Sequence, residues 1–132
     1  MIYVDSSVLL AALFAEDRIP PKEFWQEELI SSRLAEYEVY VRLHAPRAGV
    51  PSLENARTLL RSLDWLEMTP LALARALEPF PRPLALRTPD ALHLASALHL
   101  RQEGFEARLA TYDRRLAAAA RAVGLDLAEL PA

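Results

Sequence analysis

Four acidic residues in four separated segments are the strongest candidates for chemistry: Asp5, Glu38, Asp90 and Asp113. Asp5 and Asp113 each follow a short apolar segment that is expected to form a strand, and each precedes an expected helix. Ligands of open parallel sheets bind beyond the carboxyl ends of the strands, so both acids should lie at that edge. Asp90 falls in the first turn of another expected helix, and Glu38 lies within a helix that could pack beside it. The four carboxylates are therefore predicted to converge on one spot.

A cluster of carboxylates favours a hard divalent cation. Four acids in close contact repel one another strongly unless cations lie between them. Mg²⁺ and Mn²⁺ prefer oxygen ligands, and the absence of cysteine excludes disulfides and thiolate metal sites. A bound cation lowers the pKa of a water molecule and stabilises the charge that gathers on a phosphate. The predicted chemistry is metal-dependent phosphodiester hydrolysis, which needs no nucleophilic serine or cysteine.

Each acid also has a simpler interpretation when it is considered alone. Asp5 and Asp113 stand where helix N-caps are expected, and aspartate is favoured there without any metal. Asp90 is favoured by the helix dipole in a first turn. Glu38 precedes Arg42 by four residues, the favoured orientation for an ion pair on a helix surface. Only the combination of the four positions points to a shared site.

The three histidines have no metal-ligand spacing with one another. His93 follows Asp90 by about one helical turn and could face the same site, but a hydrogen-bonded structural role is the plainer interpretation. His44 and His99 are expected on helix surfaces.

Two pairs of polar residues flank the acids. Ser6 and Ser7 are expected to act first as helix caps, although a hydroxyl beside Asp5 could orient a water at the metal. Arg114 and Arg115 could contact an RNA phosphate, or they could simply be exposed at the start of a helix.

Bulk properties describe one globular domain over residues 1–132, with 52% hydrophobic and 25% charged residues. The formal net charge of −3 argues mildly against a nucleic-acid-binding protein. Bound cations would reverse the sign locally, and fourteen of the fifteen basic residues are arginines, which hold phosphate through a planar fork. No apolar run is long enough to span a bilayer and no basic segment precedes the first one, so a cytoplasmic protein is expected.

Short apolar runs alternate with helical patterns along the chain. This alternation predicts an α/β sandwich with a mostly parallel sheet. The apolar positions of the 33–44 helix are Leu34, Tyr37, Val41 and their neighbours, whereas the helix that Thr88 is expected to cap is apolar almost all round and should be buried. Strands are expected at 2–4, 29–30, 65–68, 108–111 and 125–127, and helices at 8–15, 33–44, 53–63, 71–77, 89–102 and 113–124.

Four short motifs in this order resemble those of the PIN domains, and within them the VapC-type toxins of bacterial toxin–antitoxin pairs. The motifs are Ile2-Tyr-Val-Asp5-Ser-Ser7, Ser32-Arg-Leu-Ala-Glu-Tyr-Glu38, Thr88-Pro-Asp90-Ala-Leu-His93-Leu-Ala95 and Thr111-Tyr-Asp113-Arg-Arg-Leu116. Each motif is weak when it is taken separately. Their order and spacing are specific, and the resemblance covers almost the whole chain.

The resemblance implies a Mg²⁺- or Mn²⁺-dependent endoribonuclease, a homodimer, and a VapB-like antitoxin whose C-terminal segment enters the active site. It also implies a three-layer sandwich with a five-stranded, mostly parallel sheet. The family acids fall on Asp5, Asp90 and Asp113, and the helical glutamate falls on Glu38, with Glu36 as a lesser candidate. These four acids would be the metal ligands and the catalytic residues. Pro89 stands where many relatives have an apolar residue, which should not disturb the site.

Other protein classes fit the sequence less well. A receiver-like domain needs a lysine near its last strands, and Lys22 is the only lysine. A haloacid-dehalogenase-like phosphatase begins with two aspartates separated by one residue, whereas this chain has Ser7 at the second position. A non-catalytic PIN scaffold that serves as a binding partner, and a general RNA-processing nuclease, remain the alternatives. The sequence does not specify the RNA target.

Overall fold

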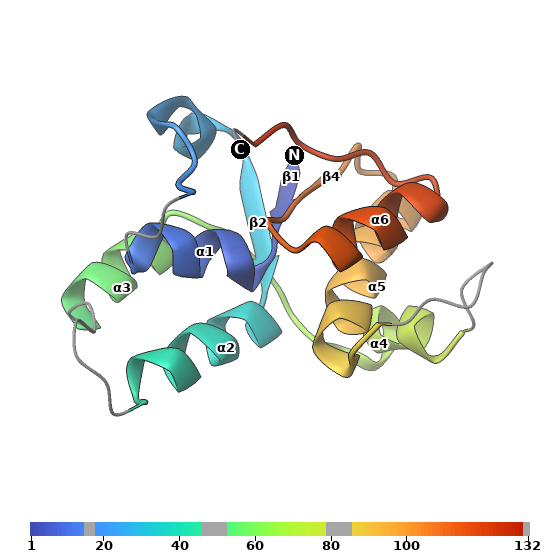
Figure 1. Ribbon diagram of the computed structural model, residues 1–132. Helices are drawn as coiled ribbons and strands as arrows, with labels where there is room; N and C mark the ends of the chain where they lie inside the picture. Colours follow the sequence, from blue (N-terminus) through green and yellow to red (C-terminus); the bar gives the residue numbers. More distant parts are fainter. Residues whose placement is uncertain (15–17, 46–52, 79–85, 131–132) are drawn as a thin grey trace.

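The computed structural model describes residues 1–14, 18–45, 53–78 and 86–130, and the fold is a parallel sheet between two layers of helices (Figure 1). The sheet has four strands in the order β3-β2-β1-β4. These strands are β1 (Ile2–Val4), β2 (Leu29–Ser32), β3 (Asp64–Leu66) and β4 (Arg108–Ala110). All three pairings are parallel, so every strand ends at the same edge. The predicted α/β sandwich is confirmed.

The fifth strand that was expected at 125–127 is not formed. This segment makes one isolated bridge, in which Leu127 pairs with Leu109. The backbone nitrogen of Leu109 donates to the carbonyl of Asp126 at 2.9 Å, and the nitrogen of Ala128 donates to the carbonyl of Leu109 at 2.8 Å. Because both hydrogen bonds meet at Leu109, the segment touches the sheet edge without extending it, and the described sheet has four strands.

One face of the sheet is covered by α1 (Ser6–Leu13), α2 (Arg33–Leu43) and α3 (Leu53–Arg61). Alternate residues of a strand point to opposite faces, and Ile2 and Val4 of β1 point to this side. The core of this layer also contains Val8, Leu9, Phe24, Leu29, Ala35, Val39, Ala56 and Leu60. Phe24 comes from a short 3₁₀ helix at Lys22–Gln26 that the sequence did not predict.

The opposite face is covered by α5 (Thr88–Gln102) and α6 (Arg114–Ala122), with α4 (Pro70–Leu77) packed on α5. Tyr3 points to this side, together with Leu94, Leu109 and Leu116. Every residue of α5 from 93 to 100 is buried, as its nearly continuous apolar surface predicted. His99 is therefore buried as well, and its expected surface position was wrong. His44 is exposed, as expected.

The buried stripe of α2 consists of Ala35, Val39 and Leu43, whereas Tyr37 and Val41 are 68% and 51% exposed. Apolar residues occur on most sides of this helix, so its sequence alone does not determine which side is buried. The rotation of the helix is set by β2, because α2 begins directly after Ser32 without a loop. This rotation determines where Glu38 lies.

Most element ends differ from the expected ones by one or two residues, as is usual for helix and strand ends. The N-cap of α5 is Arg87, not Thr88, because the first helical hydrogen bond runs from the nitrogen of Ala91 to the carbonyl of Arg87 at 2.9 Å. Asp90 keeps its expected place in the first turn. Across the described ranges, no helix has both the length and the apolar character needed to cross a membrane.

Candidate active site

All four acids predicted to converge line one hollow of about 370 Å³ at the carboxyl edge of the sheet: Asp5, Glu38, Asp90 and Asp113. Each comes from a different element. Asp5 follows β1 and Asp113 follows shortly after β4, while Glu38 lies on α2 and Asp90 at the start of α5. The hollow therefore lies where the two helical layers meet beyond the strand ends. Glu36, the lesser candidate, lines a different hollow and its carboxylate lies 3.3 Å from the guanidinium of Arg33.

Asp5 is a helix cap and also part of this hollow. Its Oδ1 accepts from the backbone nitrogens of Ser7 at 3.1 Å and Val8 at 3.4 Å, which caps α1. The hydroxyl of Ser7 donates to the same oxygen at 2.6 Å, and the hydroxyl of Thr111 donates to Oδ2 at 2.7 Å. The simpler interpretation of Asp5 as a helix cap is thus correct, and the same side chain also lines the acidic hollow.

The register of β1 and β4 explains the contact between Asp5 and Thr111. Val4 pairs with Ala110, so the next residue of each strand is Asp5 or Thr111, and the two side chains meet beyond the sheet. Thr111 also accepts from the backbone nitrogen of Asp113 at 2.9 Å. The hydroxyl of Ser7 accepts from the backbone nitrogen of Tyr112 at 2.9 Å. Two hydroxyl groups therefore join the turn after β1 to the turn after β4.

Asp113 caps α6 in the way that Asp5 caps α1. The backbone nitrogen of Leu116 donates to its Oδ1 at 3.0 Å. Asp113 is half-buried, and it shares two hollows with Asp90 and Glu38. These three acids therefore border a continuous polar surface.

The electrostatics of the hollow reflect crowded negative charge. Burial raises the pKa of the Asp90 carboxyl most, and the negative charge of Asp113 raises it further. His93 opposes the rise by more than Glu38 adds to it, and Arg87 opposes it least. Like charges raise a carboxyl pKa because each disfavours ionisation of the other. A bound cation would relieve this repulsion.

Burial is also the largest influence on Asp5, which is only 3% exposed and has a raised pKa. Attraction to His93 opposes the rise first, followed by the hydrogen bonds from Ser7 and Thr111. Buried carboxylates are stable only when their oxygens are hydrogen-bonded or bound to a cation. Thr111 is the one described donor to Oδ2, so this oxygen retains capacity for a ligand.

Glu38 does not form the surface ion pair with Arg42 that its spacing suggested. Its Oε1 lies 2.6 Å from Nε2 of His93, on α5, and its side chain is 27% exposed. Arg42 instead places its guanidinium 4.8 Å from the centre of the Phe14 ring. His93 is buried and hydrogen-bonded at both ring nitrogens, so the structural interpretation of this histidine was correct.

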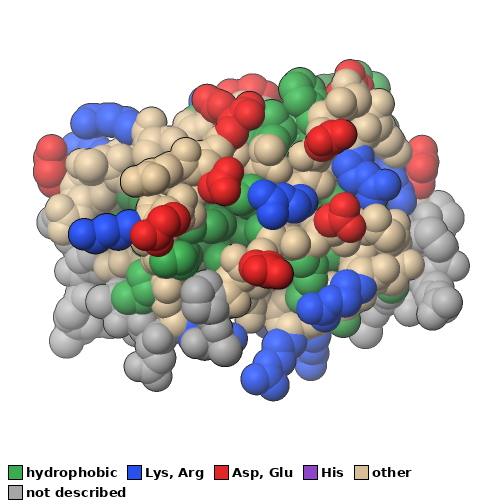
Figure 2. Space-filling view, turned by 90° about the horizontal axis from the view of Figure 1, so that it is seen from above, with side chains coloured by type: hydrophobic (Ala, Val, Ile, Leu, Met, Phe, Trp, Pro, Cys, Tyr) green, Lys and Arg blue, Asp and Glu red, His purple; other side chains and the backbone are tan. Residues whose placement is uncertain are grey.

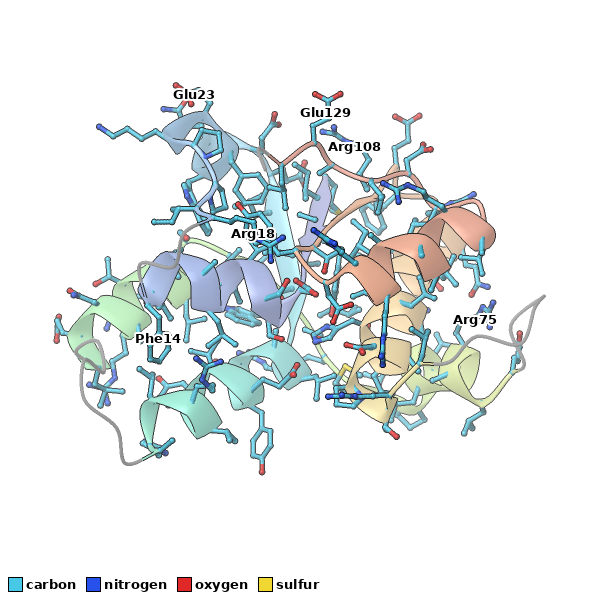
Figure 3. All side chains as sticks on the ribbon, viewed as in Figure 1. Phe14, Arg18, Glu23, Arg75, Arg108 and Glu129 are labelled. Carbon is cyan, nitrogen blue, oxygen red and sulfur yellow. The ribbon has the colours of Figure 1, made fainter. Side chains whose placement is uncertain are left out.

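Arginine side chains surround the acids. Arg18 lines the hollow, and its guanidinium lies 5.0 Å from the centre of the Tyr112 ring; Figure 3 shows it reaching toward the space between α1 and α6. Arg114 and Arg115 are exposed and line the adjoining hollow of about 400 Å³ with Asp90. Sequence analysis identified the last two arginines but missed Arg18, which lies in a connecting segment with no motif. It also gave no role to Thr111, although this residue stands in the Asp113 motif.

The donor set fits a hard divalent cation. Four carboxylates and two hydroxyls supply only oxygen, which Mg²⁺ and Mn²⁺ prefer. In the part of the chain that the structure describes, no three His, Cys, Asp or Glu side chains are close enough to form a ready metal-binding cluster. Mg²⁺ commonly binds through one or two carboxylates and keeps several waters, so a wider arrangement of acids suits it.

This architecture, a parallel sheet between helices with acids at its carboxyl edge, is matched by a family model. The model is described as "PIN domain" and covers residues 2–122. The chain therefore belongs to the PIN-domain family, as its motifs indicated.

Within this family the chain is similar to ribonuclease VapC47 of Mycobacterium tuberculosis (strain CDC 1551 / Oshkosh). The two are 35% identical over 134 residues, which cover 94% of this chain and 93% of the relative. The structure of VapBC2 from Rickettsia felis, bound to a DNA fragment from its promoter, matches 99% of this chain and 100% of that chain with a TM-score of 0.68 and 13% identity. The structure of PAE2754 from Pyrobaculum aerophilum matches 89% of this chain and 78% of that chain, with a TM-score of 0.54 and 23% identity. At these identities, the two solved structures support the fold alone.

Proposed function

We propose that this protein is a Mg²⁺- or Mn²⁺-dependent endoribonuclease and the toxin of a VapBC-type toxin–antitoxin pair. The observation that carries the proposal is that four carboxylates line one hollow of a PIN domain. The 35% identity to a VapC ribonuclease, over nearly the full length of both chains, supports RNA as the substrate class. A non-catalytic PIN scaffold would account for Asp5 and Asp113 as helix caps, but not for Asp90 in the same hollow.

The four acids have distinct roles in this proposal. Asp5, Asp90 and Asp113 hold the cation, directly or through water, and Glu38 holds it or orients the attacking water. When bound, the cation supplies an activated water and stabilises negative charge on the phosphodiester. Ser7 and Thr111 fix the Asp5 carboxylate by hydrogen bonds of 2.6 and 2.7 Å, so that this side chain needs little rearrangement to receive a ligand.

The arginines near the hollow suit a polyanionic substrate. Arg18 borders the acids, and Arg114 and Arg115 border the adjoining surface, where each could hold a phosphate of the strand. Phosphate contacts of this kind position a strand without reading its sequence, so they leave the RNA target open.

A VapB-like antitoxin is the proposed partner, and a homodimer in the cytoplasm is the proposed state. The VapBC2 structure from Rickettsia felis supports the first of these, since a chain of the same fold occurs there in a toxin–antitoxin complex. Light scattering after size-exclusion chromatography would give the mass of the protein in solution. A monomer mass would contradict the dimer and would leave the proposed chemistry untouched.

Cleavage of a structured RNA with and without divalent cations tests the activity. We expect cleavage with Mg²⁺ or Mn²⁺, none with EDTA, and none from Asp90→Asn, which removes one acid of the hollow with little change of shape. Mn²⁺ should raise the melting temperature of the wild type, because a ligand bound only by the folded state stabilises it, and Asp90→Asn should reduce this rise.

Asp126→Asn is the matched control, because Asp126 is exposed and lines a hollow that contains none of the four acids. This variant should cleave RNA like the wild type. Cleavage that persists in EDTA, or an Asp90→Asn variant as active as the control, would contradict the proposal.

A further inference from the structure

A chain of buried polar groups leads from the sheet to Glu38. Tyr3 is completely buried in the middle of β1, and its hydroxyl lies 2.7 Å from Nδ1 of His93 and 2.9 Å from the hydroxyl of Ser32. His93 is 1% exposed, and its Nε2 lies 2.6 Å from Oε1 of Glu38. This series of hydrogen-bonded side chains runs from β1 and the end of β2, through α5, to α2.

The hydrogen-bonding capacities of these groups determine that one hydrogen lies on Nε2 of His93. An ionised carboxylate only accepts, so Nε2 of His93 must carry a hydrogen to bond to Glu38. The Tyr3 hydroxyl donates to Ser32, so its oxygen is available to accept from Nδ1 of His93. An N–H of His93 then points at Glu38, and Tyr3 holds the other side of the ring.

These polar groups lie within an otherwise apolar layer. The neighbours of Tyr3 on this face include Leu94, Ala97 and Leu109. A buried polar chain of this kind is tolerated when each group is hydrogen-bonded, and it then fixes one arrangement of its members. These buried groups fix the side chain of Glu38, which lies on α2 and is partly exposed.

We propose that Ser32, Tyr3 and His93 are positioning residues that hold Oε1 of Glu38 and leave Oε2 for a ligand in the acidic hollow. This inference rests on the proposed function. Replacing a group that hydrogen-bonds to a metal ligand and orients it typically lowers metal affinity or activity about 10–100-fold. None of the three residues needs to touch the substrate.

Tyr3→Phe is the most direct test, because it removes only the hydroxyl. We expect the variant to fold, with a kcat for RNA cleavage or a Mn²⁺ affinity by calorimetry that is about 10–100-fold lower. KM for the RNA should change little, since Tyr3 is buried away from it. Tyr40→Phe is the matched control: Tyr40 lies on α2 like Glu38 but faces another hollow, and its loss of a hydroxyl should change neither quantity.

Two substitutions of His93 separate positioning from packing. The amide nitrogen of Gln lies where Nε2 lies in histidine and can donate to Glu38, whereas the shorter Asn places its amide toward Tyr3. His93→Gln should therefore retain more Mn²⁺ affinity than His93→Asn. Equal losses would indicate that the histidine only fills space.

Nitrogen-15 NMR of the wild-type imidazole gives a readout that needs neither metal nor RNA. Nε2 of His93 should be protonated at neutral pH, and a bare Nε2 would overturn the inference. So would a Tyr3→Phe variant whose kcat and Mn²⁺ affinity equal those of the wild type. If the wild type neither cleaves RNA nor binds Mn²⁺, the proposed function is wrong, and the inference is wrong with it. This outcome differs from a Tyr3→Phe variant that equals an active wild type.

Discussion

Asp5 shows how one side chain can serve the fold and the site together. Its Oδ1 caps α1 and receives the Ser7 hydroxyl, while its Oδ2 receives only the Thr111 hydroxyl among the described donors. Burial raises the pKa of this carboxyl, and attraction to His93 together with three hydrogen bonds, from Ser7, Thr111 and Val8, opposes the rise without removing it. Burial therefore disfavours the charged form of Asp5, and a bound cation would reduce this cost.

Replacement of Asp5 by Asn should make stability depend differently on pH. Because the pKa of Asp5 is higher in the folded chain than in the unfolded chain, the folded state binds more protons between the two values. The contribution of Asp5 to the free energy of unfolding is present at low pH, and it is lost as the pH rises through the pKa that Asp5 has in the folded protein. Asn does not ionise, so the stability of Asp5→Asn relative to the wild type should increase as pH rises from acid to neutral.

Urea denaturation at a series of pH values, without divalent cations, measures this difference. Any hydrogen bond that Asn cannot reproduce adds a constant offset, and only the change with pH matters. Asp126→Asn, at an exposed position away from the hollow, is the control for the substitution itself. A flat difference for Asp5→Asn would mean that its pKa is not raised in the folded protein.

Sequence analysis at this scale identified Asp5 and Asp113 because the signal was local: an apolar strand, an acid and a helix in immediate succession. The partner of Glu38 had no such signal. His93 lies 55 residues away, and its contact depends on the rotation of α2, whereas the local spacing favoured Arg42.

At the scale of elements, the site depends on two turns held side by side. Parallel pairing of β1 with β4 brings the residues after Val4 and Ala110 together, and the hydroxyls of Ser7 and Thr111 then connect the two turns. The caps of α1 and α6 lie in these turns, so the position of both helices is tied to the position of both acids.

Thr111→Val should weaken this connection while keeping the shape of the side chain. The variant loses the hydrogen bond to Asp5 and leaves the backbone nitrogen of Asp113 without its acceptor. Loss of such partners in a partly buried site costs about 1–3 kcal/mol of the free energy of unfolding. Thr111→Ser retains the hydroxyl and should lose less. Chemical denaturation checks both, and equal losses in the two variants would show that the methyl group, not the hydroxyl, stabilises the turn.

The order and type of the elements could be predicted because alternating strands and helices leave few arrangements for a chain of this length. Two features could not. The buried side of α2 is determined by its direct connection to β2, because its apolar residues surround the helix. The 125–127 segment has the composition of a strand, but within the described part of β4 it pairs with Leu109 alone, so it stops at a bridge.

For the whole molecule, the distribution of charge is more informative than its sum. The net charge is −3, yet Arg18, Arg114 and Arg115 border the acidic hollows. The face seen from above in Figure 2, on the side of the N-terminus, mixes acidic, basic and hydrophobic side chains without one sign prevailing. Divalent cations bound by the four acids would offset the negative charge of the carboxyl edge beside these arginines.

The salt dependence of RNA binding tests whether these arginines hold the strand. Each phosphate neutralised on a single strand contributes a slope of about −0.7 to the plot of log affinity against log salt concentration. A variant with both Arg114→Ala and Arg115→Ala should bind more weakly, with a slope shallower by about 1.4 if each arginine holds one phosphate. The measurement is fluorescence anisotropy of a labelled RNA at fixed Mg²⁺, in an Asp90→Asn background so that the RNA stays intact.

Arg108→Ala supplies the comparison, because Arg108 is exposed at the amino end of β4 and Asp113 follows the other end (Figure 3). Removing this arginine lowers the net charge by about half as much as the double variant does, and at a distance from the hollow. If the double variant changes the slope and Arg108→Ala does not, the effect comes from phosphate contacts beside the acids. If Arg108→Ala changes the slope as much as each arginine of the pair does, the RNA responds only to total charge, and the proposed path of the strand beside the hollow is wrong.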